Sequence, residues 1–210
     1  TIPFGVGGGH EVRARYMAPY LSKQLPESPT LVHKNVSGGR PITVTHLFYM
    51  RARSNGSEML GVSASTLYPY MLGDPRVRYD FDKWTPIIAS PTGGVVYIQP
   101  DLGVSSASDL GKLEGVPLPF AAQGPTQLEL PVMLALDLMG LELRPVFGMT
   151  SRGEGRLAFE RGEAKVDFQT TSAYLNSVTD LVADNKAIPL FSLGILNEEG
   201  DTIRDPAFPD

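Results

Sequence analysis

Near the start of the chain the glycine cluster Gly5-Val6-Gly7-Gly8-Gly9 runs directly into a helix predicted from about Glu11 to Gln24. The residues before the cluster, Thr1 to Phe4, have the pattern of the end of a strand. A glycine-rich turn between a strand and a helix exposes several backbone N–H groups, and the helix dipole adds partial positive charge there. The opening of the chain therefore predicts a cradle for an anion, with a purely structural turn as the alternative.

The glycine cluster differs from the two common nucleotide-binding loops. A Walker loop would need Gly-Lys-Ser or Gly-Lys-Thr after it, and none follows. A dinucleotide-binding loop that began at Gly5 and Gly7 would need a third glycine at the position of His10. No cofactor is therefore predicted.

Three later turns have the same chemical character, because each follows a predicted strand, precedes a predicted helix and is rich in hydrogen-bond donors. They are Ser37-Gly38-Gly39-Arg40, Ser63-Ala64-Ser65-Thr66 and Gln123-Gly124-Pro125-Thr126. In an open parallel sheet such turns lie at the carboxyl edge of the strands, where ligands bind. Each turn alone fits ordinary turn chemistry, but the four together predict a site for a small polar anion.

Strand and helix patterns alternate along the chain, which predicts a mostly parallel α/β architecture of seven or eight strands. The first predicted helix has an apolar face formed by Val12, Tyr16, Met17, Tyr20 and Leu21. The predicted strands are 30–36, 59–62, 86–89, 95–99, 116–122, 143–147, 165–168 and 188–193. The later predicted helices are 41–53, 155–161 and 174–183, with capping boxes at 106–109 and 126–129 opening two more. A seam near residues 90–102 suggests two lobes, residues 1–95 and 96–210.

The composition is that of an ordinary globular protein. The chain has 210 residues, of which 42% are hydrophobic and 20% charged, with a formal net charge of −5. Nucleic acid is not expected as a partner, because the acidic chain has no cluster of lysines and arginines. There are no cysteines, so disulfides and thiol nucleophiles are excluded. No stretch approaches the length of apolar sequence that a membrane helix needs.

Catalytic and metal-binding motifs are weak. The segment Gly61-Val62-Ser63-Ala64-Ser65 is similar to the nucleophile elbow of serine hydrolases, but Ser65 stands where a glycine is favoured. The three histidines show neither metal spacing nor a triad order. We therefore predict no catalytic residue, no metal and no enzyme, with a hydrolase using Ser63 as the alternative. Asp167 ends an apolar strand, where it either caps the next turn or accepts a hydrogen bond from a ligand hydroxyl, amine or water.

Several motifs together resemble the Bug family, the substrate-binding proteins of tripartite tricarboxylate transporters. The resemblance rests on Pro3-Phe4-Gly5-Val6-Gly7-Gly8-Gly9 followed by Arg15, on Asn35-Val36-Ser37-Gly38-Gly39, and on the stretch from Gly153 to Asp167 with its Gly162-Glu163 pair. Their order and spacing agree with the family over most of the chain. The chain departs from the family at His10-Glu11, at Arg40 and at Asn55.

The resemblance implies a two-lobed periplasmic-binding-protein fold of the second type, with a ligand cleft between the lobes. It implies a periplasmic monomer that binds a small carboxylate and docks on membrane transporter subunits. A sensory or adaptor binding protein is the alternative role. Relative to the family, the chain is expected to lack its first strand and the C-terminal segment that returns to lobe one, so that lobe one exposes apolar surface.

The predicted ligand site draws on both lobes. One carboxylate is expected on the N–H groups of residues 7–10 and of the turn at 37–39, with Arg40 as a possible direct ion pair. The far end of the ligand is expected to meet polar groups of the later turns. The predicted site residues are Phe4, Gly7, Gly8, Gly9, His10, Ser37, Gly38, Gly39, Arg40, Ser63, Ser65, Gln123, Gly124, Gln127, Asp167 and Thr171.

Overall fold

The structure is a computed structural model that describes residues 1–4, 9–36 and 41–208. Its contacts divide the chain into two compact units. The first unit comprises Thr1–Trp84 with Thr126–Leu128, and the second comprises Thr85–Pro125 with Glu129–Asp210. The division after Trp84 precedes the predicted seam, and the lobe boundary proposed between residues 95 and 96 falls inside the first strand of the second unit.

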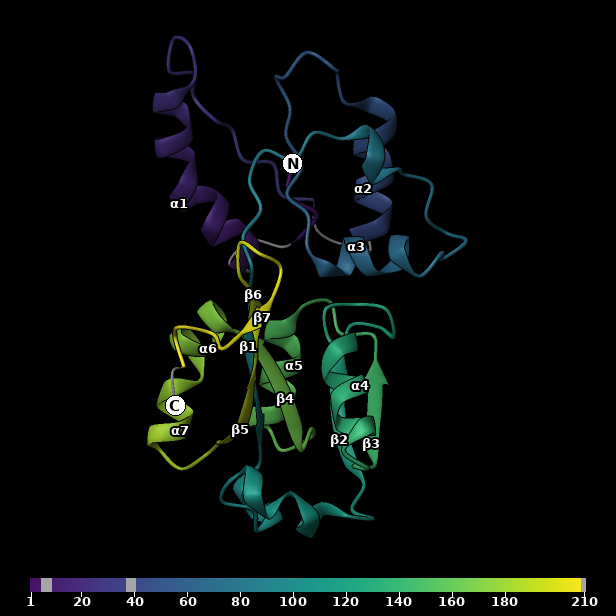
Figure 1. Cartoon of the computed structure of the whole chain (residues 1–210), viewed down its shortest axis with the longest axis vertical. Coiled ribbons are helices and arrows are strands. Elements are labelled where there is room, and N and C mark those ends of the chain that lie inside the picture. Colours follow the sequence, from purple (N-terminus) through teal and green to yellow (C-terminus); the bar gives the residue numbers. More distant parts are fainter. Residues whose placement is uncertain (5–8, 37–40, 209–210) are drawn as a thin grey trace. The chain divides into compact units, whose positions relative to one another are not determined.

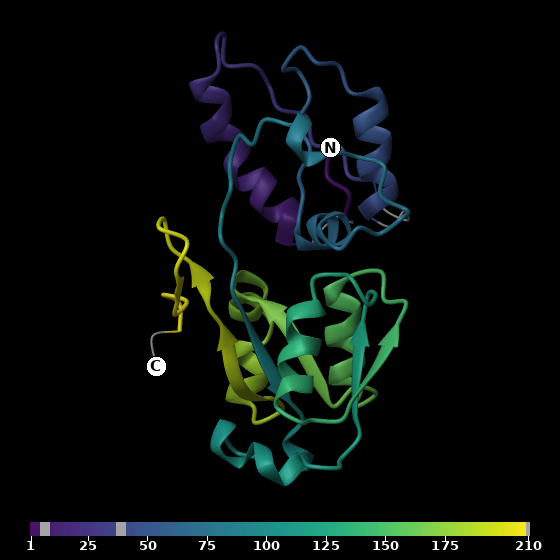
Figure 2. The same ribbon diagram turned by 45° about the vertical axis from the view of Figure 1, so that its right-hand side comes forward.

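The second unit is built on a five-stranded sheet in the order β3-β2-β4-β1-β5 (Figure 2). Strand β2 pairs in parallel with β3 and β4, whereas β1 pairs antiparallel with β4 and β5. Four strands thus run in one direction, as the sequence predicts, and β1 is the exception. The strands are β1 (Gly94–Ile98), β2 (Leu118–Ala122), β3 (Leu143–Phe147), β4 (Val166–Thr170) and β5 (Ile188–Leu193).

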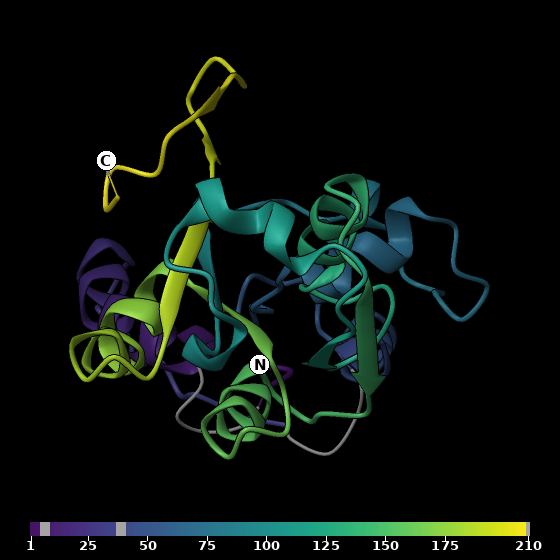
Figure 3. The ribbon, with the colours of Figure 1, turned by 90° about the horizontal axis from the view of Figure 1, so that it is seen from below.

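Helices cover both faces of this sheet, with α5, α6 and α7 on one face and α4 on the other (Figure 3). The helices are α4 (Leu130–Leu138), α5 (Arg152–Glu160), α6 (Thr171–Ser177) and α7 (Thr179–Ala183). Two 3₁₀ segments, Pro100–Leu102 and Ala107–Leu113, link β1 to β2, and β6 (Ile195–Leu196) pairs with β7 (Thr202–Ile203). Strand β1 is buried along its whole length because it is an inner strand covered on both faces.

The core beneath α5 and α6 is apolar and aromatic. Tyr97 of β1 lies edge-on to Phe159 of α5, with ring centroids 4.9 Å apart, and Phe159 is 1% exposed. Val95, Ala121, Ala158 and Val178 complete the same buried cluster. This packing holds the last turn of α5 against β1 and β2.

In its described residues the first unit contains three α-helices, α1 (Gly9–Gln24), α2 (Pro41–Arg51) and α3 (Ala64–Met71), and a 3₁₀ turn at Phe81–Lys83 (Figure 1). Helices α2 and α3 pack together, whereas α1 packs little against either of them. Tyr79, which is buried, stacks near Trp84 and donates a hydrogen bond from its hydroxyl to the Thr66 carbonyl, 2.6 Å away. The aromatic residues after α3 therefore hold the end of this unit against α3.

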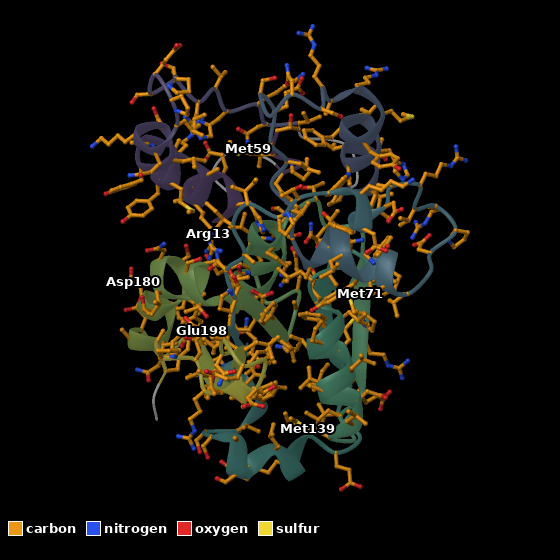
Figure 4. The ribbon with its side chains drawn as sticks, turned by 45° about the horizontal axis from the view of Figure 1, so that its top comes forward. Arg13, Met59, Met71, Met139, Asp180 and Glu198 are labelled. Carbon is orange, nitrogen blue, oxygen red and sulfur yellow. The ribbon has the colours of Figure 1, made fainter. Side chains whose placement is uncertain are left out.

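The apolar face predicted for α1 is largely exposed. Val12, Tyr16 and Tyr20 are 53%, 69% and 60% exposed, and the Tyr16 and Tyr20 rings lie 5.4 Å apart. Met59 and Met71 of the same unit are also exposed (Figure 4). These residues lie on one helix, as their spacing predicts, and the spacing does not show whether another element covers the face that they share.

Several predicted elements do not form. Residues 30–36 and 59–62 are not strands, apart from one parallel bridge between Ile2 and Asn35, and residues 86–89 are irregular. The capping box at 106–109 opens a 3₁₀ segment, and the Ser106 side chain makes no capping bond. Helix α4 begins at Leu130, and Glu129 makes no capping bond either. None of the described helices is long and apolar enough to cross a membrane.

Candidate functional site

Three short segments of the first unit lie side by side and run in the same direction. Ile2 donates its N–H to the Lys34 carbonyl at 2.8 Å and accepts from Val36 at 2.9 Å, which is the parallel pattern. Thr1 makes the same pattern on its other side, through the Met59 carbonyl and the Gly61 N–H. These three segments precede α1, α2 and α3 in the sequence.

Phe4 and His10 meet at this edge. Their ring centroids are 4.5 Å apart, and the Asn35 side chain holds the Phe4 carbonyl with a hydrogen bond of 3.1 Å. His10 also makes a hydrogen bond with the backbone of Val62, immediately before α3. Burial lowers the pKa of His10, and Arg13 lowers it further. His10 therefore stands at this edge as a neutral group rather than as a positive charge for an anion.

Glu11 places a carboxylate in the first turn of α1. The side chain is buried and forms an ion pair with Arg15, one turn along the helix. Its charge is thus compensated within α1, where a negative charge also suits the helix dipole.

Ser63 and Ser65 have structural hydrogen bonds. Ser63 caps α3, since its hydroxyl oxygen accepts from the Ser65 N–H at 3.1 Å. The Ser65 hydroxyl is buried and accepts a hydrogen bond of 3.0 Å from the N–H of Leu128. Leu128 belongs to the first unit, as Ser65 does. Among the described residues no histidine or carboxylate bonds to Ser63, so the hydrolase alternative gains no support.

Some predicted site residues lie outside the described residues. These are Gly7, Gly8, Ser37, Gly38, Gly39 and Arg40, whereas Gly9 is the first residue of α1. The grouping of His, Asp and Glu residues that a metal ion would need does not occur in the described parts of the chain.

A surface hollow of about 430 Å³ lies along α2 in the first unit. It is lined by Ile42, Thr43, His46, Tyr49, Met50, Arg76 and Arg78. The imidazole of His46 accepts a hydrogen bond from the Arg78 N–H at 2.7 Å. The hollow includes none of the predicted site residues that the structure describes.

In the second unit the predicted polar residues are mostly engaged with the protein itself. The N–H of Gln123 donates to a carboxylate oxygen of Glu129, 3.0 Å away. The Thr171 hydroxyl is bonded to the buried carboxylate of Asp205. Gln127, which belongs to the first unit, is buried, and its side-chain carbonyl oxygen has no hydrogen-bond partner among the described residues. Gly124 is buried beside Gln123.

Asp167 lies in the interior and does not present its carboxylate at the surface. It is fully buried and receives hydrogen bonds from the Tyr97 hydroxyl and, at 3.0 Å, from the Gln169 amide. Its other oxygen forms an ion pair with Arg152. Burial raises the pKa of Asp167, against the opposing effect of Arg152. The Asp167 carboxylate thus takes its hydrogen bonds from protein groups, whereas the functional interpretation of the sequence has a ligand as the donor.

Arg152, in the first turn of α5, is the centre of this buried group and was not predicted. Its guanidinium makes five hydrogen bonds and lies 5.5 Å from the centroid of the Phe120 ring. The partners are the carbonyls of Ala121 and Phe168 and the carboxylates of Glu129 and Asp167. Burial works against its charge, but the two carboxylates outweigh it and raise the pKa of Arg152. An arginine directly after the capping Ser151 has the sequence pattern of a solvated helix start, so its burial has no local signal.

The chain matches solved structures of binding proteins. A structure described as a periplasmic transporter matches with a TM-score of 0.73 at 19% identity, over 91% of this chain and 64% of that chain. R. palustris Rpa4515 with adipate matches with a TM-score of 0.68 at 18% identity, over 92% and 64%. MatC from Rhodopseudomonas palustris with bound malate matches with a TM-score of 0.69 at 15% identity, over 94% and 67%.

The fold is therefore the mixed α/β fold of the two-lobed periplasmic binding proteins, which confirms the predicted fold class. The periplasmic binding protein BugD also matches, with a TM-score of 0.60 at 16% identity, over 93% of this chain and 64% of that one. No family model and no curated protein matches the sequence. The chain spans about 64% of the length of the first of these structures.

Proposed function

We propose that this protein is an extracytoplasmic solute-binding protein that captures a small mono- or dicarboxylate for a tripartite tricarboxylate-type transporter. The observation that carries the proposal is the shared fold with structures that hold adipate and malate. The motifs that resemble the Bug family support it, and so does the likeness to BugD. Periplasmic location, docking on membrane transporter subunits and a monomeric state belong to the same proposal.

The first unit supplies the groups that suit a carboxylate. Its three parallel segments lead toward the starts of α1, α2 and α3, and helix starts present free N–H groups and partial positive charge. We assign the carboxylate to the N–H groups of residues 7–10 and of the turn at 37–39. Backbone capture needs no buried cation in the empty protein, which fits the neutral His10.

The protein is proposed to bind its ligand without converting it. Ser63 is committed to capping α3, and the Arg152 group is enclosed by protein. Hydrolysis of simple esters that is abolished in S63A would contradict this part of the proposal.

Calorimetry tests the ligand class. The panel comprises malate, adipate, 6-hydroxyhexanoate, an amino acid and a neutral sugar of similar size. Binding of at least one carboxylate, with no heat from the sugar, is expected. Tight binding of the sugar and of no carboxylate would show that the site is not an anion site.

A further inference from the structure

The carboxylate of Glu129 is held as a bound anion would be held. One of its oxygens accepts the N–H of Gln123, at the end of β2, and also the Arg152 guanidinium at 2.8 Å. A strand-end N–H and an arginine are the donors that proteins use to bind carboxylates. The Glu129 side chain is fully buried, and its second oxygen has no partner among the described residues.

We propose that the second unit contains a built carboxylate site and that the chain's own Glu129 occupies it as an internal ligand. The same strand-end turn, at Gln123-Gly124, is one of the four that the sequence marks as an anion cradle. The Gln123 N–H of this turn is already bonded to Glu129 and is therefore not available to a ligand carboxylate.

The donors of this site are held in place by groups other than Glu129. The Ala121 and Phe168 carbonyls and the Asp167 carboxylate fix the guanidinium of Arg152. Gly155 leaves room for it, because a Cβ at that position would lie 2.9 Å from both the Ala121 oxygen and an Arg152 nitrogen. The site therefore persists as an empty anion pocket when the carboxylate of Glu129 is removed.

One guanidinium faces two carboxylates, those of Glu129 and Asp167. Both oxygens of Asp167 are engaged, whereas one Glu129 oxygen retains its accepting capacity.

Thermal unfolding in the presence of a small carboxylate tests whether Glu129 occupies a carboxylate site, and it needs no transport ligand. Thermal unfolding of E129A, E129Q and the unchanged protein is followed in propionate and in chloride at equal ionic strength. Propionate is expected to raise the unfolding temperature of E129A alone, because it binds to Arg152 and the Gln123 N–H in the vacated space. Equal responses of E129A and the unchanged protein would overturn the inference.

A folding readout covers the case in which E129A does not fold in chloride. Soluble E129A recovered in propionate and not in chloride supports the site. Failure to recover it in either salt counts against a site that small carboxylates can fill.

Discussion

The two units of this chain differ in how their elements are held. The second unit has a five-stranded sheet covered on both faces and a buried ion-pair group at the start of α5. The first unit has three helices and three parallel segments, but its segments pair over single bridges and α1 leaves its apolar face exposed. Stability in this molecule therefore comes mainly from the second unit, whereas the groups assigned to the ligand carboxylate belong to the first.

Among the changes considered, Arg152→Ala is expected to lower the free energy of unfolding most. It leaves two buried carboxylates without their cation, which costs about 3–5 kcal/mol and destabilises the second unit. Chemical denaturation followed by circular dichroism measures the loss. The control R156A breaks the ion pair with Glu160, which is more exposed, and costs less than about 1 kcal/mol. Equal losses in the two variants would refute the central place of Arg152.

Truncation of one aromatic residue in each unit sharpens the contrast. Phe159→Ala opens a cavity in the second unit and costs about 3–5 kcal/mol, because Phe159 is 1% exposed. Tyr16→Ala on α1 changes the free energy of unfolding by less than about 0.5 kcal/mol, because Tyr16 is 69% exposed. A large loss in Y16A would mean that α1 is covered in solution.

Gly155→Ala tests the close approach of α5 to the end of β2. The added Cβ would lie 2.9 Å from the Ala121 oxygen and from Arg152, so a loss of about 1–3 kcal/mol is expected despite the better helix propensity of alanine. G111A is the control, since a Cβ there meets nothing within 4 Å. Equal stability of G155A and G111A would mean that α5 approaches the Ala121 carbonyl and the Arg152 side chain less closely than the structure shows.

His10 gives the smallest expected effect and reports on the first unit. Its pKa is lowered in the folded protein by burial, so the unfolded chain binds the proton more readily. The contribution of His10 to stability is therefore present above its ordinary pKa of about 6.5 and is lost as the pH falls below that value. An NMR titration of the imidazole measures the pKa, and a value at or above the ordinary one contradicts the buried position.

The sequence predicted the second unit better than the first. Strands β3 and β5 lie where their apolar patterns place them, because each is long enough to pair along its whole length. The antiparallel direction of β1 was missed, since direction depends on distant partners and leaves no local pattern. Segments 30–36 and 59–62 have strand composition but form only isolated pairs.

The predicted site divides in the same way. In the first unit short parallel segments precede α1, α2 and α3, and Phe4 meets His10 there, whereas the turns at 5–8 and 37–40 lie outside the described residues. The sequence predicted that Glu129 belongs to a capping box. In the structure its side chain makes no capping bond and forms a buried ion pair with Arg152 of another helix. Spacing along one helix cannot show a partner that the fold brings from elsewhere.

The most direct test is an NMR titration of backbone amides with adipate and with 6-hydroxyhexanoate. If the ligand carboxylate is bound by the first unit, the amide signals of residues 7–10 and 37–39 shift on binding of either compound. The Gln123 amide signal is then the same with both compounds, although their far ends differ. Saturable binding that moves the Gln123 amide and leaves the amides of the first unit unchanged would contradict both the proposed site and the internal carboxylate.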